Sequence, residues 1–98
     1  MPTRDIHIKS SHPKKAIPLL KDAIDRERKL ILHSISVTRA KINQLASSLK
    51  VSIPELLRGE VARTAGNEQE LLELEWEVAI LQHLEEELSS VEDLKVCP

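Results

Sequence analysis

The chain has 98 residues, 14 Lys and Arg against 16 Asp and Glu for a net charge of −2, and one aromatic residue, Trp76. This length allows one small domain, and two glycines are too few for the many turns of a β-sandwich or barrel. A single cysteine, Cys97, excludes a disulfide framework and a thiolate metal cluster. The charge is unevenly divided, because residues 1–66 carry 13 basic against 6 acidic residues, and residues 67–98 carry one against 10. The two parts therefore attract each other.

The sequence contains no run that approaches the ~20 apolar residues needed to span a bilayer, and its polar first eleven residues do not resemble a signal peptide. We therefore expect a cytoplasmic protein in a reducing compartment. There, Cys97 is expected to be an ordinary terminal residue, with an intermolecular disulfide as the alternative. We expect no cofactor.

Residues 1–16 are predicted to form an extended N-terminal arm. Within it, residues 4–9 alternate polar and apolar side chains, with Ile6 and Ile8 on one side, which is the pattern of a short strand. A lone strand needs another strand beside it, and we expect a partner chain to supply one.

The first long helix is predicted over residues 17–50, with Pro18 in its first turn and residues 13–16 as a separate turn. Its apolar residues recur at whole numbers of helical turns and so share one narrow stripe, in which Thr38 fills a gap. These core positions are Leu20, Ile24, Ile31, Ile35, Ile42, Leu45 and Leu49. A helix about 48 Å long cannot bury this stripe against itself, so it needs a second helix.

A short helix and a second long helix are predicted to follow, over residues 53–63 and 67–95. Ser52 and Glu55 have the spacing of a capping box at the start of the short helix. The apolar residues of the second long helix drift round its axis. We assign four of them, Leu74, Val78, Leu81 and Leu88, to the hairpin core. The prediction is an all-α protein, a long antiparallel helical hairpin with a short connecting helix over residues 17–98.

A second apolar patch lies on the other side of the second long helix. Leu72, Trp76, Ala79 and His83, which we call the Trp76 patch, are roughly 180° from Leu74 at 100° per residue. One partner helix cannot cover both sides of this helix. We therefore expect the patch to bind a second copy of the chain, in a homodimer or larger helix bundle, or a different protein.

Two arrangements fit hydrolytic chemistry. Glu70, Glu73 and Glu77 share a helix face, and all-α nucleotide pyrophosphohydrolases hold magnesium through helical carboxylates of this kind. Arg28 and His33 fit the loose spacing of an all-α ribonuclease family, as Arg26 and His33 also do. A histidine can move protons while an arginine stabilises charge on the scissile phosphate. Solvated helix surface is the simpler interpretation of both sets, and the histidines are too scattered for zinc. We expect no metal and no enzymatic activity.

Nucleic-acid binding is a further alternative. Arg4, Lys9, Lys14 and Lys15 gather in and after the predicted strand, so the arm could contact DNA phosphates. The sequence has no aromatic side chains interleaved with these basic residues to stack on bases. We therefore do not favour nucleic acid as the partner.

Three segments, residues 23–27 (Ala-Ile-Asp-Arg-Glu), 52–56 (Ser-Ile-Pro-Glu-Leu) and 74–77 (Leu-Glu-Trp-Glu), precede a Glu- and Leu-rich end near Cys97. In this layout the chain resembles a group of small prokaryotic helical proteins, some of which are thought to be antitoxin partners of a neighbouring toxin gene. The resemblance implies a protein partner such as a toxin, with the segment around Trp76 as the contact region.

The sequence thus favours a non-enzymatic protein–protein interaction module, antitoxin-like, that self-associates and binds another protein. The alternatives are a small DNA-binding regulator that uses the basic arm, and a metal-dependent nucleotide or RNA hydrolase.

Overall fold

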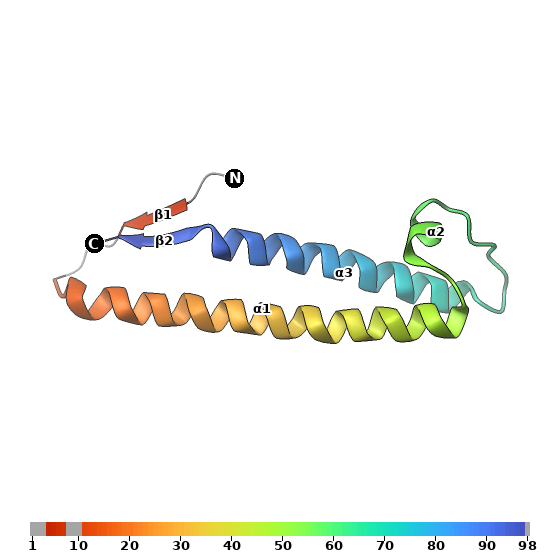
Figure 1. Cartoon of the computed structure of the whole chain (residues 1–98), viewed down its shortest axis with the longest axis horizontal. Helices are drawn as coiled ribbons and strands as arrows, with labels where there is room; N and C mark the ends of the chain where they lie inside the picture. Colours follow the sequence, from red (N-terminus) through yellow and green to blue (C-terminus); the bar gives the residue numbers. More distant parts are fainter. Residues whose placement is uncertain (1–3, 8–10, 98) are drawn as a thin grey trace. The chain divides into compact units, whose positions relative to one another are not determined.

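The computed structural model describes residues 4–7 and 11–97, without the side chains of residues 4, 13 and 95–97. Its elements, in chain order, are β1 (Arg4–His7), α1 (Pro13–Leu49), α2 (Ile53–Leu57), α3 (Glu68–Glu92) and β2 (Leu94–Cys97) (Figure 1). The chain divides into two compact units, Met1–Ser34 with Leu84–Pro98, and Ile35–His83. Both α1 and α3 contribute residues to each unit.

The hairpin core lies in the unit Ile35–His83, where the end of α1, the short α2 and the start of α3 pack together. Its buried residues are Ile42, Leu56, Leu71, Leu74 and Val78. Half-buried apolar side chains surround them, namely Leu45, Ala46, Leu49, Val51, Ile53, Val61 and Leu81. Because α1 packs against α3 across this core, the predicted all-α helical hairpin with a short connecting helix is confirmed.

The first long helix begins at Pro13, so the prediction of a separate turn before a start at residue 17 was wrong. Proline is favourable as the first residue of a helix, since its fixed φ suits the helix and its missing N–H would have no partner there. The carbonyl of His12 accepts from the N–H groups of Lys15 and Ala16, both at 3.0 Å. The helix continues through Pro18. Because proline has no N–H, one backbone carbonyl near the exposed start of the helix lacks its helical hydrogen bond.

The C-terminal end of α1 is a Schellman motif formed without glycine. Lys50 adopts a left-handed φ of 57°, and the N–H of Val51 donates to the carbonyl of Ala46 at 3.0 Å. A second bond runs from the Lys50 N–H to the carbonyl of Ser47 at 3.3 Å. This turn directs Val51 back into the hairpin core.

The short helix α2 begins at the predicted position but ends earlier than predicted. The hydroxyl of Ser52 accepts from the N–H of Glu55 at 3.3 Å, as the capping spacing indicates. Gly59, with a φ of 71°, ends the helix, and the N–H of Glu60 donates to the carbonyl of Glu55 at 3.0 Å. The predicted extension to residue 63 was wrong because this second Schellman motif reverses the chain at Gly59.

The unit Met1–Ser34 with Leu84–Pro98 contains a two-stranded parallel sheet of β1 and β2 (Figure 1). The pairing runs from Arg4 opposite Leu94 to His7 opposite Cys97. The strand expected at residues 4–9 is therefore present as β1, while Ile8 and Lys9 lie outside the described residues. The expectation that β1 pairs only with a partner chain was wrong, because the chain supplies β2 itself.

The second long helix is shorter than the predicted range of residues 67–95. It spans Glu68–Glu92, and the residues after Asp93 are extended because they pair with β1. Among the described helices, none has a segment both long and apolar enough to cross a membrane.

Candidate protein interface

The two sides of α3 differ sharply in exposure within the unit Ile35–His83. Leu71 and Leu74 are 0% exposed, whereas Leu72 is 55% and Trp76 is 68% exposed. Ala79 is also exposed, as is His83, the last residue of the Trp76 patch. Apolar side chains thus occupy both sides of one helix, and only one side is buried.

The predicted core positions fall into two groups by burial. Those that are buried are Ile31, Ile35, Ile42, Leu74 and Val78. Those that are half-buried are Leu20, Ile24, Leu45, Leu49, Leu81 and Leu88. Thr38, the polar residue in the apolar stripe of α1, is buried as well.

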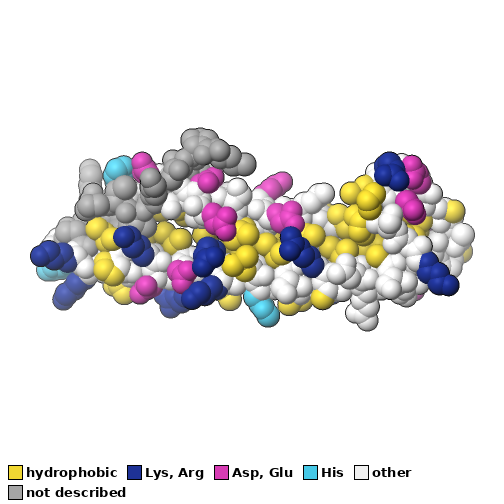
Figure 2. Space-filling view, in the orientation of Figure 1, with side chains coloured by type: hydrophobic (Ala, Val, Ile, Leu, Met, Phe, Trp, Pro, Cys, Tyr) yellow, Lys and Arg dark blue, Asp and Glu magenta, His cyan; other side chains and the backbone are white. Residues whose placement is uncertain are grey.

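Two buried core residues, Leu71 and Leu56, are not among the predicted core positions. Leu71 belongs to the drifting apolar row of α3, and its step of three to Leu74 was the available signal. Leu56 is the buried residue of α2, where five helical residues are too few for a periodic pattern. Figure 2 shows exposed hydrophobic side chains over α2, which include Leu57 at 61% exposure.

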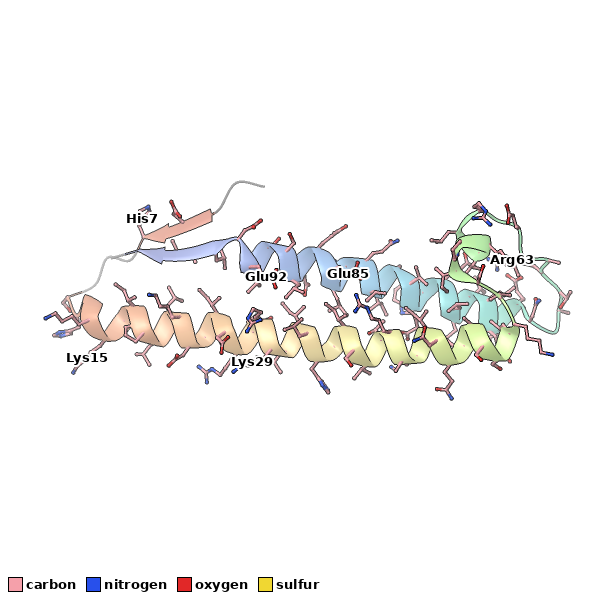
Figure 3. All side chains as sticks on the ribbon, in the orientation of Figure 1. His7, Lys15, Lys29, Arg63, Glu85 and Glu92 are labelled. Carbon is pink, nitrogen blue, oxygen red and sulfur yellow. The ribbon has the colours of Figure 1, made fainter. Side chains whose placement is uncertain are left out.

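Arg63, in the loop before α3, forms ion pairs with two glutamates of that helix (Figure 3). Its guanidinium donates to Glu68 at 3.2 Å and also donates to Glu75. The hydrogen bond with Glu75, and the charges of both carboxylates, raise the pKa of Arg63 above its usual value. Because Glu75 lies three residues after Leu72 and four before Ala79, it is a neighbour of both on the helix surface, and the ion pair lies beside the Trp76 patch.

The side chain of Asn67 orders the same loop. Its Oδ1 accepts from the N–H of Thr64 at 2.8 Å, and its Nδ2 donates to the carbonyl of Ala62 at 3.0 Å. These two hydrogen bonds tie the loop to Asn67, the residue directly before the first residue of α3.

The helix that carries the patch is strongly acidic. The α3 sequence contains nine Glu and no Lys or Arg, whereas α1 contains eight Lys and Arg against three Asp and Glu. The opposite charges lie on the two helices that form the hairpin, so each helix also presents one predominant sign of charge to other molecules.

An open groove of about 440 Å³ runs between the two helices in the unit Ile35–His83. Its lining residues are Lys41, Gln44, Leu45 and Ser48 of α1 and Glu70, Glu73 and Glu77 of α3. The three glutamates thus share a face, as predicted. Within the described ranges, however, no three His, Cys, Asp or Glu side chains gather closely enough to hold a metal ion.

The second hydrolytic set, Arg28 and His33, is not brought together on α1. Residues five apart on a helix point about 140° away from each other. Asp25 instead holds the Arg28 guanidinium at 3.2 Å and the Lys29 ammonium at 3.0 Å. The hydrogen bonds from Lys29 and Arg28 lower the pKa of the Asp25 carboxyl below its usual value. Arg28 therefore forms an ion pair with Asp25 within its own helix.

The residues considered for nucleic-acid contact are only partly within the described structure. Lys14 and Lys15 are exposed in the first turn of α1, and Figure 3 shows Lys15 at that end of the helix. Lys9 and the side chain of Arg4 lie outside the described residues. DNA binding through the arm stays a prediction.

Comparison of the sequence with protein-family models finds no match, and comparisons with curated proteins and with solved structures also find no similar protein. The class that the fold defines is an all-α helical hairpin, and the exposed Trp76 patch is its candidate binding surface.

Proposed function

We propose that this chain is a non-enzymatic protein–protein interaction module that self-associates through the Trp76 patch. The observation that carries the proposal is the 68% exposure of Trp76, the only aromatic residue, on a helix whose other side carries the fully buried Leu71 and Leu74. Tryptophan is a frequent energetic anchor of protein interfaces, because its large surface is covered when a partner binds.

The occupant that we propose for the patch is a second copy of the chain. Patches on two α3 helices that met directly would bring two strongly acidic helices together, which is unfavourable. A second copy also offers α1, which has a net positive charge and exposes Leu19 and Leu30. The favoured arrangement is therefore α3 of one copy on α1 of the other, which a two-fold axis repeats symmetrically.

The resemblance to antitoxin partners supports a second class of ligand for the same patch. The acidic α3 would bind a basic surface of the toxin, and so cover the part of the toxin that faces nucleic acid. Such a partner would compete with the second copy, since both would cover Trp76.

The test is the molar mass of the purified chain in solution across a range of concentrations, by sedimentation or light scattering. We expect a homodimer or larger assembly that dissociates on dilution. Trp76→Ala should weaken it by about 2 kcal/mol, or roughly thirty-fold in Kd. Because Trp76 is exposed, its removal should leave the helical content unchanged.

The matched control is Leu57→Ala, which removes an exposed apolar side chain from the same unit but outside the patch. It should leave the association unaffected. A monomeric wild-type chain at every concentration, or equal weakening by both substitutions, would refute self-association through the Trp76 patch.

A further inference from the structure

The sheet formed by β1 and β2 is incomplete as an isolated element. It has two strands of four residues each, and in the described part of the chain β1 pairs with β2 alone. Parallel sheets are almost always larger and covered, and two strands are marginal in water. The other edge of β1 therefore presents backbone N–H and C=O groups that another strand can pair with.

We propose that the open edge of β1 pairs antiparallel with β1 of a second copy, across a two-fold axis that passes beside Ile6. The residues of β1 make this pairing self-complementary. With Ile6 opposite the same residue of the other copy, Asp5 lies opposite His7 and His7 opposite Asp5. Each carboxylate then faces an imidazole that can donate a hydrogen bond to it.

The burial of β1 agrees with this register. Ile6 is half-buried, whereas Asp5 and His7 are exposed, and Figure 3 shows His7 on β1. In a sheet, residues directly opposite each other lie on the same face. The pairing thus joins two half-buried isoleucines on one face and two pairs of polar side chains on the other.

The neighbouring registers are unfavourable. A shift of two residues in one direction places Asp5 opposite Asp5, and a shift in the other direction places His7 opposite His7. Two carboxylates directly opposite repel each other, and two imidazoles directly opposite lose the carboxylate acceptor that the centred register supplies. A shift by a single residue is excluded, because a two-fold axis perpendicular to the sheet requires opposed residues to share a face. Only the register centred on Ile6 sets unlike groups opposite each other.

The surface assigned here is separate from the Trp76 patch and belongs to the other unit of the chain. The experiment is disulfide trapping in the whole 98-residue chain with Cys97→Ser as background, under mild oxidation. In the centred register, the two copies of residue 6 are direct neighbours, at a separation that a disulfide spans. The Ile6→Cys variant should therefore be converted largely to a covalent dimer.

The matched control is Asp5→Cys. Its two copies would be diagonal neighbours across the strand pair, about 7–8 Å apart, which is too far for a disulfide without backbone movement. We expect a large excess of dimer for Ile6→Cys over Asp5→Cys at equal concentration and time. Equal trapping of the two variants, or no trapping of either, would overturn the pairing of β1 with β1.

A second set of variants tests the charge pairing without cysteine. Asp5→Lys should reduce association, and adding His7→Asp should restore it, because the carboxylate acceptor and the hydrogen-bond donor are exchanged between the two positions. Failure of the second substitution to restore association would also overturn the register. Repeating the trapping with Trp76→Ala separates the two surfaces, since Ile6→Cys should still be trapped more than Asp5→Cys if the Trp76 patch has another role.

Discussion

The two units of this chain bury the apolar residues of their helices to very different degrees. In the unit Ile35–His83, α1, α2 and α3 together bury Ile42, Leu56, Leu71, Leu74 and Val78 in one cluster. In the unit Met1–Ser34 with Leu84–Pro98, Ile31 is the one buried side chain among the described residues. The apolar stripe of α1 passes through both units, so the pattern of the stripe alone does not determine burial.

This difference indicates which part of the chain is stable by itself. The free energy of folding depends mainly on apolar area removed from water, so most of it should come from the unit with the continuous core. The other unit exposes Leu19 and Leu30 and has a two-stranded sheet with an open edge. Contacts with another molecule would stabilise that unit more than they would stabilise the hairpin core.

The largest expected effect on stability comes from replacing leucine by alanine in α3, once in the part of the helix that belongs to each unit. Leu74→Ala should lower the free energy of unfolding by about 2–5 kcal/mol, because it leaves a cavity at a fully buried position. Leu88→Ala, in the half-buried part of α3, should cost on the order of 1 kcal/mol. Urea unfolding at one fixed protein concentration measures both. Equal losses would mean that the two units are packed equally well.

A smaller effect should come from the end of α1 in the unit with the larger core. Lys50→Gly should raise the free energy of unfolding by about 0.5–1 kcal/mol, because glycine adopts the left-handed φ of 57° without the strain of a Cβ. Lys41→Gly makes the same change at an exposed interior position of the same helix. It should lower stability by roughly 1 kcal/mol. A loss of stability in both variants, in the same thermal or urea assay, would contradict the Schellman motif at Lys50.

The helices were predictable from the sequence because their apolar residues obey a local period. The steps between Ile31, Ile35 and Ile42 placed these residues on one face, and all three are buried. The N-cap of α2 at Ser52 was also predictable, because the spacing of three residues between Ser52 and Glu55 is a local sequence signal. The same helical geometry placed Trp76 on the side of α3 opposite Leu74, and Trp76 is exposed.

The remaining features depend on contacts that local patterns do not encode. β2 has four residues, and its pairing with β1 joins positions 90 residues apart in the chain, from Arg4 to Leu94. The early end of α2 at Gly59 and the left-handed Lys50 are set by turn hydrogen bonds that suit several sequences. The identity of a binding partner has no local signal either, because an exposed patch specifies size and charge but not the molecule that covers it.

The most direct test of self-association is the fluorescence of wild-type Trp76, measured together with molar mass over a dilution series. The chain has no other tryptophan, so the emission reports only on the patch. We expect the emission maximum to shift to shorter wavelength as the dimer forms, with the same concentration midpoint as the mass, because the indole leaves water. If the mass rises while the emission remains that of a water-exposed indole, the chains associate elsewhere and the Trp76 patch is not their interface.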